Sequence, residues 1–193
     1  AVREASLKAG QAIVSAYALH ATDLLIPSLK QGIFDANWRI RQSSVILLGE
    51  FLSKVLGKNI GEEDTVQQTD VNISEFIGGQ SNDILAVLYL VRNDLNAAVQ
   101  NRASVTWKSI VTNTPKTVKS ILPELMNLIM EALATSGDKR EVARYTLADV
   151  VVKLSSRVLP DILPYLSNAL KSSNPCDREG AALGLCNLMS AVG

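Results

Sequence analysis

The residues that could carry acid–base or metal chemistry are few in this chain. The sequence has one histidine, His20, and two cysteines, Cys176 and Cys186, which do not form a CxxC pair. A lone histidine between apolar residues is more often structural than catalytic, and a metal site with two histidines cannot form. The acidic residues at 62–64 fall in a predicted loop, which would not hold carboxylates in a catalytic geometry. Because no glycine-rich phosphate-binding motif is present either, we predict no catalytic, cofactor-binding or metal-binding residues.

The two cysteines are ten residues apart in the sequence. Along one helix this separation is about 15 Å, which is too long for a disulfide. We therefore expect two reduced thiols, as is usual in the cytoplasm. We interpret both residues as small apolar members of the core.

The charge balance does not favour a dedicated nucleic-acid-binding protein. Lys plus Arg and Asp plus Glu each number 19, so the formal net charge is zero, whereas such proteins usually have a basic excess. Local basic groups could still contact RNA or an acidic partner, although every helical repeat protein needs a charged surface. The candidates for a partner-binding surface are Trp38, Arg39, Lys108, Lys116, Lys119, Arg140 and Arg144.

The two tryptophans occupy different places in the sequence pattern. Trp107 shares its repeat position with Leu48 and Val150, which predicts a core residue. Trp38 lies at a predicted turn, where it could clamp a helical hairpin or form an exposed anchor for a partner.

A second set of polar residues recurs at a fixed spacing across predicted turns. Asp35 and Arg41 are six residues apart, and so are Asp94 and Gln100. This spacing predicts a ladder of hydrogen bonds between stacked repeats, in which Arg3 and Arg41 reach carboxylates or turn carbonyls of a neighbouring repeat. A contact with phosphate is the functional alternative.

The elements that position these residues are indicated by an internal repeat. A short apolar motif with a central proline occurs at 25–29, 121–125 and 162–166, and a version with alanine occurs at 84–88. The third positions are 27, 86, 123 and 164, so the intervals are 59, 37 and 41 residues. Two helices in about 37 to 47 residues is the period of HEAT and armadillo repeats. We expect each proline near the start of a helix, where a missing N–H costs little.

The predicted fold is therefore all-α, a right-handed HEAT-repeat α-solenoid in which neighbouring helix pairs stack to bury their apolar faces. Residues 1–193 would form a single segment with one leading helix and four pairs. The expected ranges are about 2–20 for the leading helix and about 22–57, 81–114, 117–158 and 160–192 for the pairs. Exposed apolar end faces would favour weak self-association.

Two further expectations concern the ends of these elements. The interval of 59 residues is about 20 longer than the repeat period, and the excess, 58–80, is expected to be an inserted flexible loop. The stretch without charges near the start, 9–22, is too short to span a membrane. Since the first residue is not Met, we interpret the chain as a piece of a longer protein.

Two segments of the chain resemble one known family closely. The first begins Phe34-Asp35-Ala36-Asn37-Trp38-Arg39-Ile40-Arg41 and continues to 50, and the second covers 109–117 and continues to 123. Both resemble the ribosome-associated translational activators of general amino-acid control, and the resemblance extends over essentially the whole chain.

The resemblance implies a cytoplasmic, non-catalytic HEAT scaffold. Members of this family promote activation of the kinase that acts on the alpha subunit of initiation factor two during amino-acid starvation or ribosome stalling. The implied partners are the ribosome, that kinase and an ATP-binding-cassette protein, all contacted through the full-length parent. No kinase-contact residue is carried over to this chain. The alternative is a general HEAT-repeat adaptor of the nuclear-transport or phosphatase-scaffold type.

Overall fold

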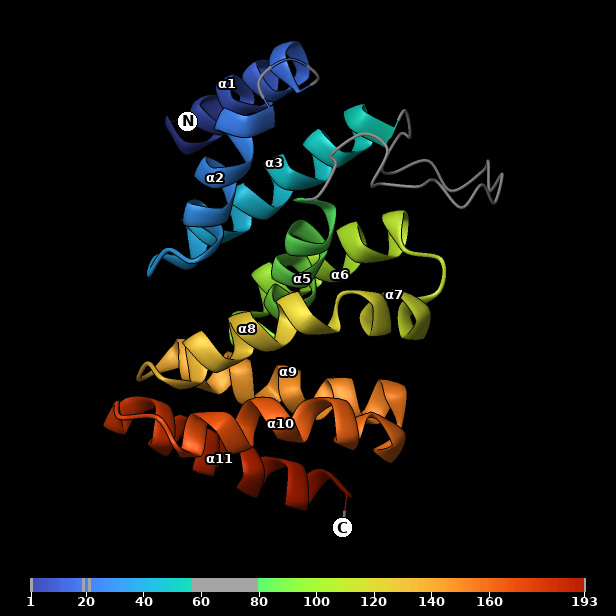
Figure 1. Cartoon of the computed structure of the whole chain (residues 1–193). Helices are drawn as coiled ribbons and strands as arrows, with labels where there is room; N and C mark the ends of the chain where they lie inside the picture. Colours follow the sequence, from blue (N-terminus) through green and yellow to red (C-terminus); the bar gives the residue numbers. More distant parts are fainter. Residues whose placement is uncertain (1, 19, 21, 57–79, 193) are drawn as a thin grey trace. The chain divides into compact units, whose positions relative to one another are not determined.

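The described part of the chain is built from helices. A computed structural model describes residues 2–18, 20, 22–56 and 80–192. These residues form ten α-helices and one 3-10 helix, and none of them is in a strand (Figure 1). The all-helical prediction is confirmed. Most of the predicted loop, at 58–79, lies outside the described residues.

The helices form two compact units, and the first comprises the described residues of 1–84 and 96–112. It contains α1 (Val2–Tyr17), α2 (Thr22–Ile33), α3 (Trp38–Leu56) and α6 (Ala97–Ile110). Helix α3 packs against the other three. Trp107 is 1% exposed, as predicted for a core residue.

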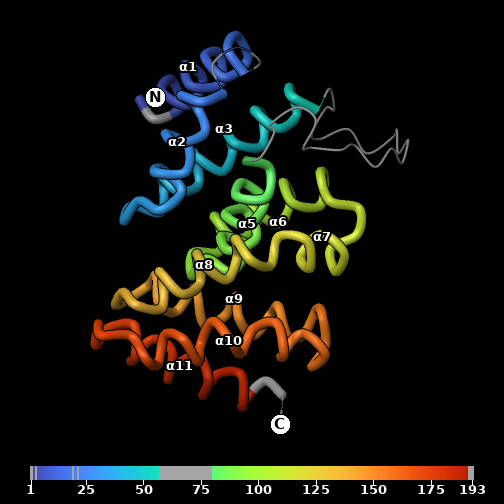
Figure 2. The backbone as a smooth tube through the Cα atoms, viewed as in Figure 1, coloured from blue at the N-terminus to red at the C-terminus, as the bar shows by residue number. Residues whose placement is uncertain are grey.

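The second unit comprises the described residues of 85–95 and 113–193, so helix α5 (Ser81–Val91) begins in the first unit and ends in the second. Its other helices are α7 (Thr114–Ser120), α8 (Leu122–Leu133), α9 (Asp138–Leu154), a 3-10 helix (Ser156–Val158), α10 (Leu159–Leu170) and α11 (Pro175–Val192). Helix α9 packs against α7, α8 and α11, and α10 and α11 lie side by side (Figure 2).

Asparagine side chains start four of these helices. Asn37, Asn96, Asn113 and Asn174 each accept a hydrogen bond on Oδ1 from the backbone N–H two or three residues further on, at 3.0 Å in every case. This contact satisfies one of the N–H groups that a helix leaves without a partner in its first turn. Helix α9 instead follows Gly137, whose φ of 68° is a left-handed conformation that favours glycine.

The expected position of the repeat prolines is wrong in two helices out of three. Pro27 and Pro164 lie inside α2 and α10, and Pro123 alone is in the first turn of its helix. Pro123 differs from the other two because the first helix of the third expected pair is broken at Ile121 into α7 and α8, so that α8 starts just before this proline. Proline removes the N–H that would bond to the carbonyl four residues earlier, and here that gap coincides with the break.

That the expected ranges are repeat units stays a prediction. The observed helices differ from these ranges at one boundary, the start of the third pair. Helix α7 begins at Thr114, three residues before the expected start at 117, because Asn113 caps it. Asn113 is therefore the cap, and residues 114 and 115 belong to the first turn, of a helix that starts between the two expected pairs.

Helices α8 and α11 come close together at a glycine. A Cβ atom placed on Gly180 would lie 2.6 Å from the backbone oxygen of Leu133. A side chain at this position would therefore force the two helices apart.

Candidate partner-binding surface

The start of α3 holds an aromatic and a cationic side chain in contact. The guanidinium carbon of Arg39 lies 4.7 Å from the centroid of the Trp38 ring, within the range of a cation–π interaction. Trp38 is half-buried and Arg39 is exposed. The preceding turn is ordered by Asp35, whose Oδ1 accepts the N–H of Asn37 at 2.7 Å. The ring therefore packs on the hairpin while part of its surface stays accessible.

Arg41 folds back over the turn that precedes α3. Its Nη1 donates to the carbonyl oxygens six and five residues earlier, both at 3.0 Å. Arg178 makes the same two contacts at the start of α11, at 2.8 and 2.9 Å. We call this arrangement the turn brace. In both cases the arginine lies four residues after the capping asparagine, and it satisfies turn carbonyls that the chain leaves free.

The predicted ladder between repeats is distinct from these contacts. The turn brace lies within a single hairpin, so the ladder stays a prediction. Asp94 is buried, with 6% of its surface exposed, and Gln100 is exposed on α6. The side chain of Arg3 lies outside the described residues.

Three predicted lysines are exposed. Lys108 lies on α6 in the first unit, and Lys116 and Lys119 lie on α7 in the second. Among the described residues none of the three has a carboxylate within 4.0 Å. Their charges are therefore available to an external partner.

The two predicted arginines of α9 are engaged within the second unit. Arg140 Nη1 lies 2.7 Å from Glu179 Oε1, and its Nε donates to the carbonyl of Thr135. Arg144 Nη1 lies 2.9 Å from Glu141 Oε1. The Arg140 pair joins α9 to α11, whereas Arg144 pairs with a residue of its own helix. Because each arginine already has a carboxylate, both are weaker candidates for a partner contact than the lysines.

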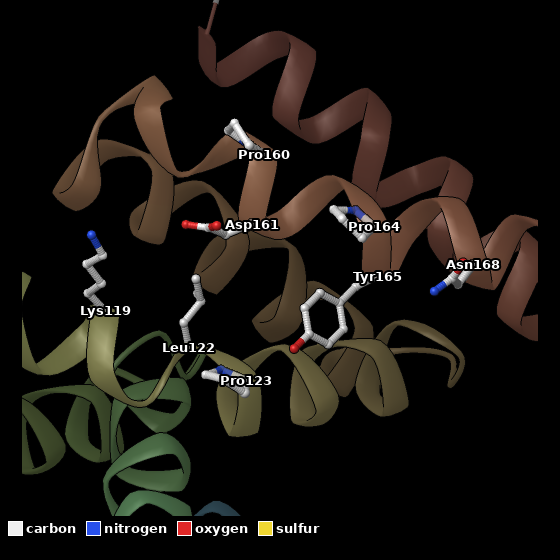
Figure 3. Close-up of a pocket in the computed structure, with 8 residues that line it drawn as sticks. All are labelled: Lys119, Leu122, Pro123, Pro160, Asp161, Pro164, Tyr165 and Asn168. Atoms are coloured by element: carbon white, nitrogen blue, oxygen red, sulfur yellow. The ribbon is translucent and has the colours of Figure 1, made fainter.

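A groove of about 580 Å³ lies between α8 and α10 in the second unit (Figure 3). Its lining residues are Lys119, Leu122, Pro123, Pro160, Asp161, Pro164, Tyr165 and Asn168. The sequence pattern marked two of the prolines as repeat positions and gave no sign that they share a groove. The lining offers apolar surface with one cation and one carboxylate, and it holds no nucleophile beside a base.

A buried tyrosine that sequence reasoning missed connects α5 to α9 within the second unit. Tyr89 is 0% exposed, and its hydroxyl donates to Asp149 Oδ2 at 2.6 Å. Burial raises the pKa of this hydroxyl far above its usual value, and the hydrogen bond to the Asp149 carboxylate raises it further. The Arg92 guanidinium lies 4.9 Å from the centroid of the tyrosine ring. This cluster is a packing element inside the unit.

The interpretation of the cysteines as core residues is wrong. Cys176 and Cys186 are free thiols on α11, and both are exposed. Helix α11 turns Ala181, Gly184 and Leu188 inward, which leaves Cys186 on the opposite face.

In the described ranges, no group of three or more His, Cys, Asp or Glu side chains is placed to hold a metal ion. Within those ranges, no helix has the length and apolar content needed to cross a membrane.

Comparisons with known proteins match nearly the whole chain. It is 41% identical over 202 residues to a mouse (Mus musculus) protein named stalled ribosome sensor GCN1. It is 35% identical over 213 residues to the eIF-2-alpha kinase activator GCN1 of Dictyostelium discoideum, and 39% identical over 200 residues to the Saccharomyces cerevisiae protein of that name. Each alignment covers 99% of this chain and 8% of the relative.

The chain therefore spans about a twelfth of the length of these relatives. No protein-family profile matches the chain, and no solved structure matches it. Over almost its entire length, the chain is homologous to one segment of the GCN1 proteins.

Proposed function

We propose that the chain is a non-catalytic scaffold segment of a cytoplasmic, ribosome-associated translational activator. This activator would promote activation of the eIF2-alpha kinase during amino-acid starvation or ribosome stalling. The observation that carries the proposal is an identity of 35–41% over 99% of the chain to proteins named for ribosome sensing and kinase activation. The kinase, the ribosome and an ATP-binding-cassette protein would be partners of the full-length parent.

The mechanism we propose is geometric. Helix pairs with apolar cores would stack as a right-handed HEAT α-solenoid, in which each pair is stabilised by its neighbours. Three features support this reading: capped helices, turns braced by arginine, and packed cores rich in Leu, Ile and Val. Such a segment acts by holding binding surfaces at fixed positions.

The exposed cations are the best candidates for a direct contact with the ribosome. Arg39, Lys116 and Lys119 are exposed and lie near helix starts or ends. A ribosome presents phosphates, and each phosphate that a cation neutralises releases condensed counterions. Binding by this route must therefore weaken as the salt concentration rises.

Co-sedimentation of the purified chain with ribosomes tests this contact. We expect binding at about 0.1 M salt and affinity about 10- to 20-fold lower at about 0.3 M, as three phosphate contacts would give. Reversal of the three cations (Arg39→Glu, Lys116→Glu, Lys119→Glu) should abolish it.

The control reverses the same number of exposed cations elsewhere, one in the first unit and two in the second: Lys54→Glu, Lys153→Glu and Lys171→Glu. This variant should bind like the unmodified chain. Equal loss in both variants would show that only net charge matters. Absence of binding at either salt would contradict a ribosome contact in this segment.

A further inference from the structure

The groove between α8 and α10 in the second unit has apolar walls. We call it the proline groove, because three of its eight lining residues are prolines. Leu122 and Pro123 come from the first turn of α8, and Pro160, Pro164 and Tyr165 come from α10 (Figure 3). Leu122 is buried, Tyr165 is half-buried and the prolines are exposed. A ligand that covers this apolar surface removes it from water, which favours binding.

Four polar side chains line the proline groove: Lys119, Asp161, Tyr165 and Asn168. Figure 3 shows Lys119 and Asp161 near one end and Asn168 at the other, with the Tyr165 side chain pointing from α10 toward α8. Among the residues that the structure describes, none of the four side chains has a hydrogen bond or an ion pair. The groove therefore presents a cation, a carboxylate, a hydroxyl and an amide that an external ligand can bind.

Two of the prolines also leave backbone acceptors in the groove. Pro123 lies four residues after Lys119. In the same way, Pro164 lies four residues after Pro160, and all four residues line the groove. Because proline has no N–H, the carbonyls of Lys119 and Pro160 do not receive the hydrogen bond that a regular helix would supply from that position. Each carbonyl therefore keeps the capacity to accept an N–H of a ligand.

The length of the groove sets the size of its ligand. Pro160 and Asn168 are eight residues apart on α10, which is about 12 Å along the helix axis. An extended chain in the polyproline II conformation rises about 3.1 Å per residue, so about four residues span this distance. An α-helix with its side chains is about 10–12 Å wide and would need about 900 Å³ or more over this length, whereas the groove offers about 580 Å³. An extended segment therefore fits, and a helix does not.

Hydrogen bonding favours the same kind of ligand. The side-chain amide of Asn168 carries donors and an acceptor, as a peptide group does. A polyproline II segment has no internal hydrogen bonds, so its N–H and C=O groups can bond to Asn168, to the Tyr165 hydroxyl and to the two backbone carbonyls of the groove. A helix has already paired these groups within itself.

We propose that the proline groove binds an extended segment of a partner protein in the polyproline II conformation. Two apolar residues of the segment, three positions apart and so on one face, contact Leu122 and the Tyr165 ring. Its backbone bonds to Asn168. At the other end a basic residue pairs with Asp161 and a neighbouring acidic residue pairs with Lys119, which fixes the direction of the segment more than it adds affinity. Of the cations proposed to contact the ribosome, Lys119 alone lines this groove.

Selection from a phage-displayed library tests the occupant. The probe is a set of random peptides of about 12 residues, which leaves flanks beyond the four or so residues that the groove holds. The unmodified chain should enrich peptides with proline or large apolar residues at i and i+3, beside a pair of opposite charges. Enrichment of apolar residues at i, i+3, i+4 and i+7 would overturn the proposal, because a helix would then be the ligand. Absence of any enrichment would overturn it as well.

The affinity of the most enriched peptide, measured by fluorescence polarisation, shows where it binds. Asn168→Ala should raise Kd at least about tenfold, because the donor and the acceptor of one amide are both lost. Ser167→Ala is the matched control, since Ser167 is exposed on α10 outside the groove. This control should leave Kd unchanged. Equal affinities of the two variants would contradict binding in the groove.

Exchange of the two charges tests the direction of the bound segment. Lys119 and Asp161 are both exposed, so the double variant Lys119→Asp, Asp161→Lys should fold, and circular dichroism checks this. Selection against the double variant should enrich peptides in which the acidic and the basic residue have changed places. An unchanged order of the two residues would overturn the ion pairs that we propose.

Ribosome co-sedimentation of the Asn168→Ala variant separates failure of this inference from failure of the proposed function. The substitution changes no charge, so co-sedimentation should equal that of the unmodified chain while peptide affinity falls. Loss of both would contradict a local role of Asn168, since the fold would then be altered. Absence of ribosome binding by the unmodified chain would contradict the proposed function alone, because peptide selection does not involve ribosomes.

Discussion

At the scale of single residues, the turn brace shows how one arginine can fix a helical hairpin. A helix start leaves N–H groups free, and the turn before it leaves carbonyls free. Asn37 satisfies the first group, and Arg41 satisfies the second from the same helical turn. The combination of asparagine and an arginine four residues later is visible in the sequence, and it recurs at Asn174 and Arg178.

Removal of the brace should cost stability. We expect Arg41→Ala to lower the free energy of unfolding by about 1–2 kcal/mol, because two charge-assisted hydrogen bonds from a half-buried side chain are lost. Arg39→Ala removes the same charge two residues away and should cost about 0.5 kcal/mol or less. Urea denaturation of both variants measures the difference. An equal loss of free energy of unfolding in the two variants would show that the removed charge, and not the hydrogen bonds of Arg41, causes the destabilisation.

Tyr89 makes a prediction about alkaline pH. Its pKa is raised in the folded chain, so above about pH 10 the unfolded chain loses a proton that the folded chain keeps. Stability from this group is complete below that pH and falls above it, by up to about 1.4 kcal/mol per pH unit. We expect Tyr89→Phe to lose stability at neutral pH and to show a shallower decline above about pH 10. Urea denaturation of both proteins at neutral pH and above about pH 10 measures this. An equal fall in the free energy of unfolding of the two proteins above about pH 10 would contradict the prediction.

At the scale of helices, the close contact between α8 and α11 depends on a glycine. Gly180 brings α11 against the backbone of α8, where a Cβ would meet a carbonyl oxygen at 2.6 Å. At Gly184 a Cβ would meet the end of the Leu166 side chain at 2.9 Å, which can rotate away. The two glycines lie on one face of one helix and differ in what opposes them.

This difference gives a matched pair of substitutions. Alanine raises helix propensity equally at both positions, by about 1 kcal/mol. We expect Gly180→Ala nevertheless to lower the free energy of unfolding by about 2 kcal/mol, since backbone must move. Gly184→Ala should lie within about 1 kcal/mol of the unmodified chain. Chemical denaturation with unchanged m-values checks both, and a neutral Gly180→Ala would refute the tight contact.

At the scale of the whole molecule, the sequence predicted the helices better than the surface. The internal repeat predicted the all-helical fold, and the repeat position that Trp107 shares with Leu48 and Val150 predicted its burial. The break at Ile121 could not be predicted, because the same proline motif stays helical in α2 and α10. Propensity alone does not distinguish these cases, since tertiary packing decides them.

The candidate surface depended on information that a linear pattern lacks. Arg140 meets Glu179 across 39 positions of sequence, and no local spacing predicts that pair. Cys186 lies outward because α11 packs through the face that holds Ala181, Gly184 and Leu188, and apolar character alone does not show which face a residue is on. The three exposed lysines were already candidates from the sequence, and the structure adds that no carboxylate of the described residues lies within 4.0 Å of them.

The two exposed thiols of α11 provide labelling sites at a fixed distance from each other. Cys176 and Cys186 are ten residues apart on one helix, which sets a separation of about 15 Å between their backbone positions. Spin labels or dyes attached there report a distance that is independent of any motion between other parts of the protein. The position of a third label elsewhere in the chain can then be measured relative to this fixed pair.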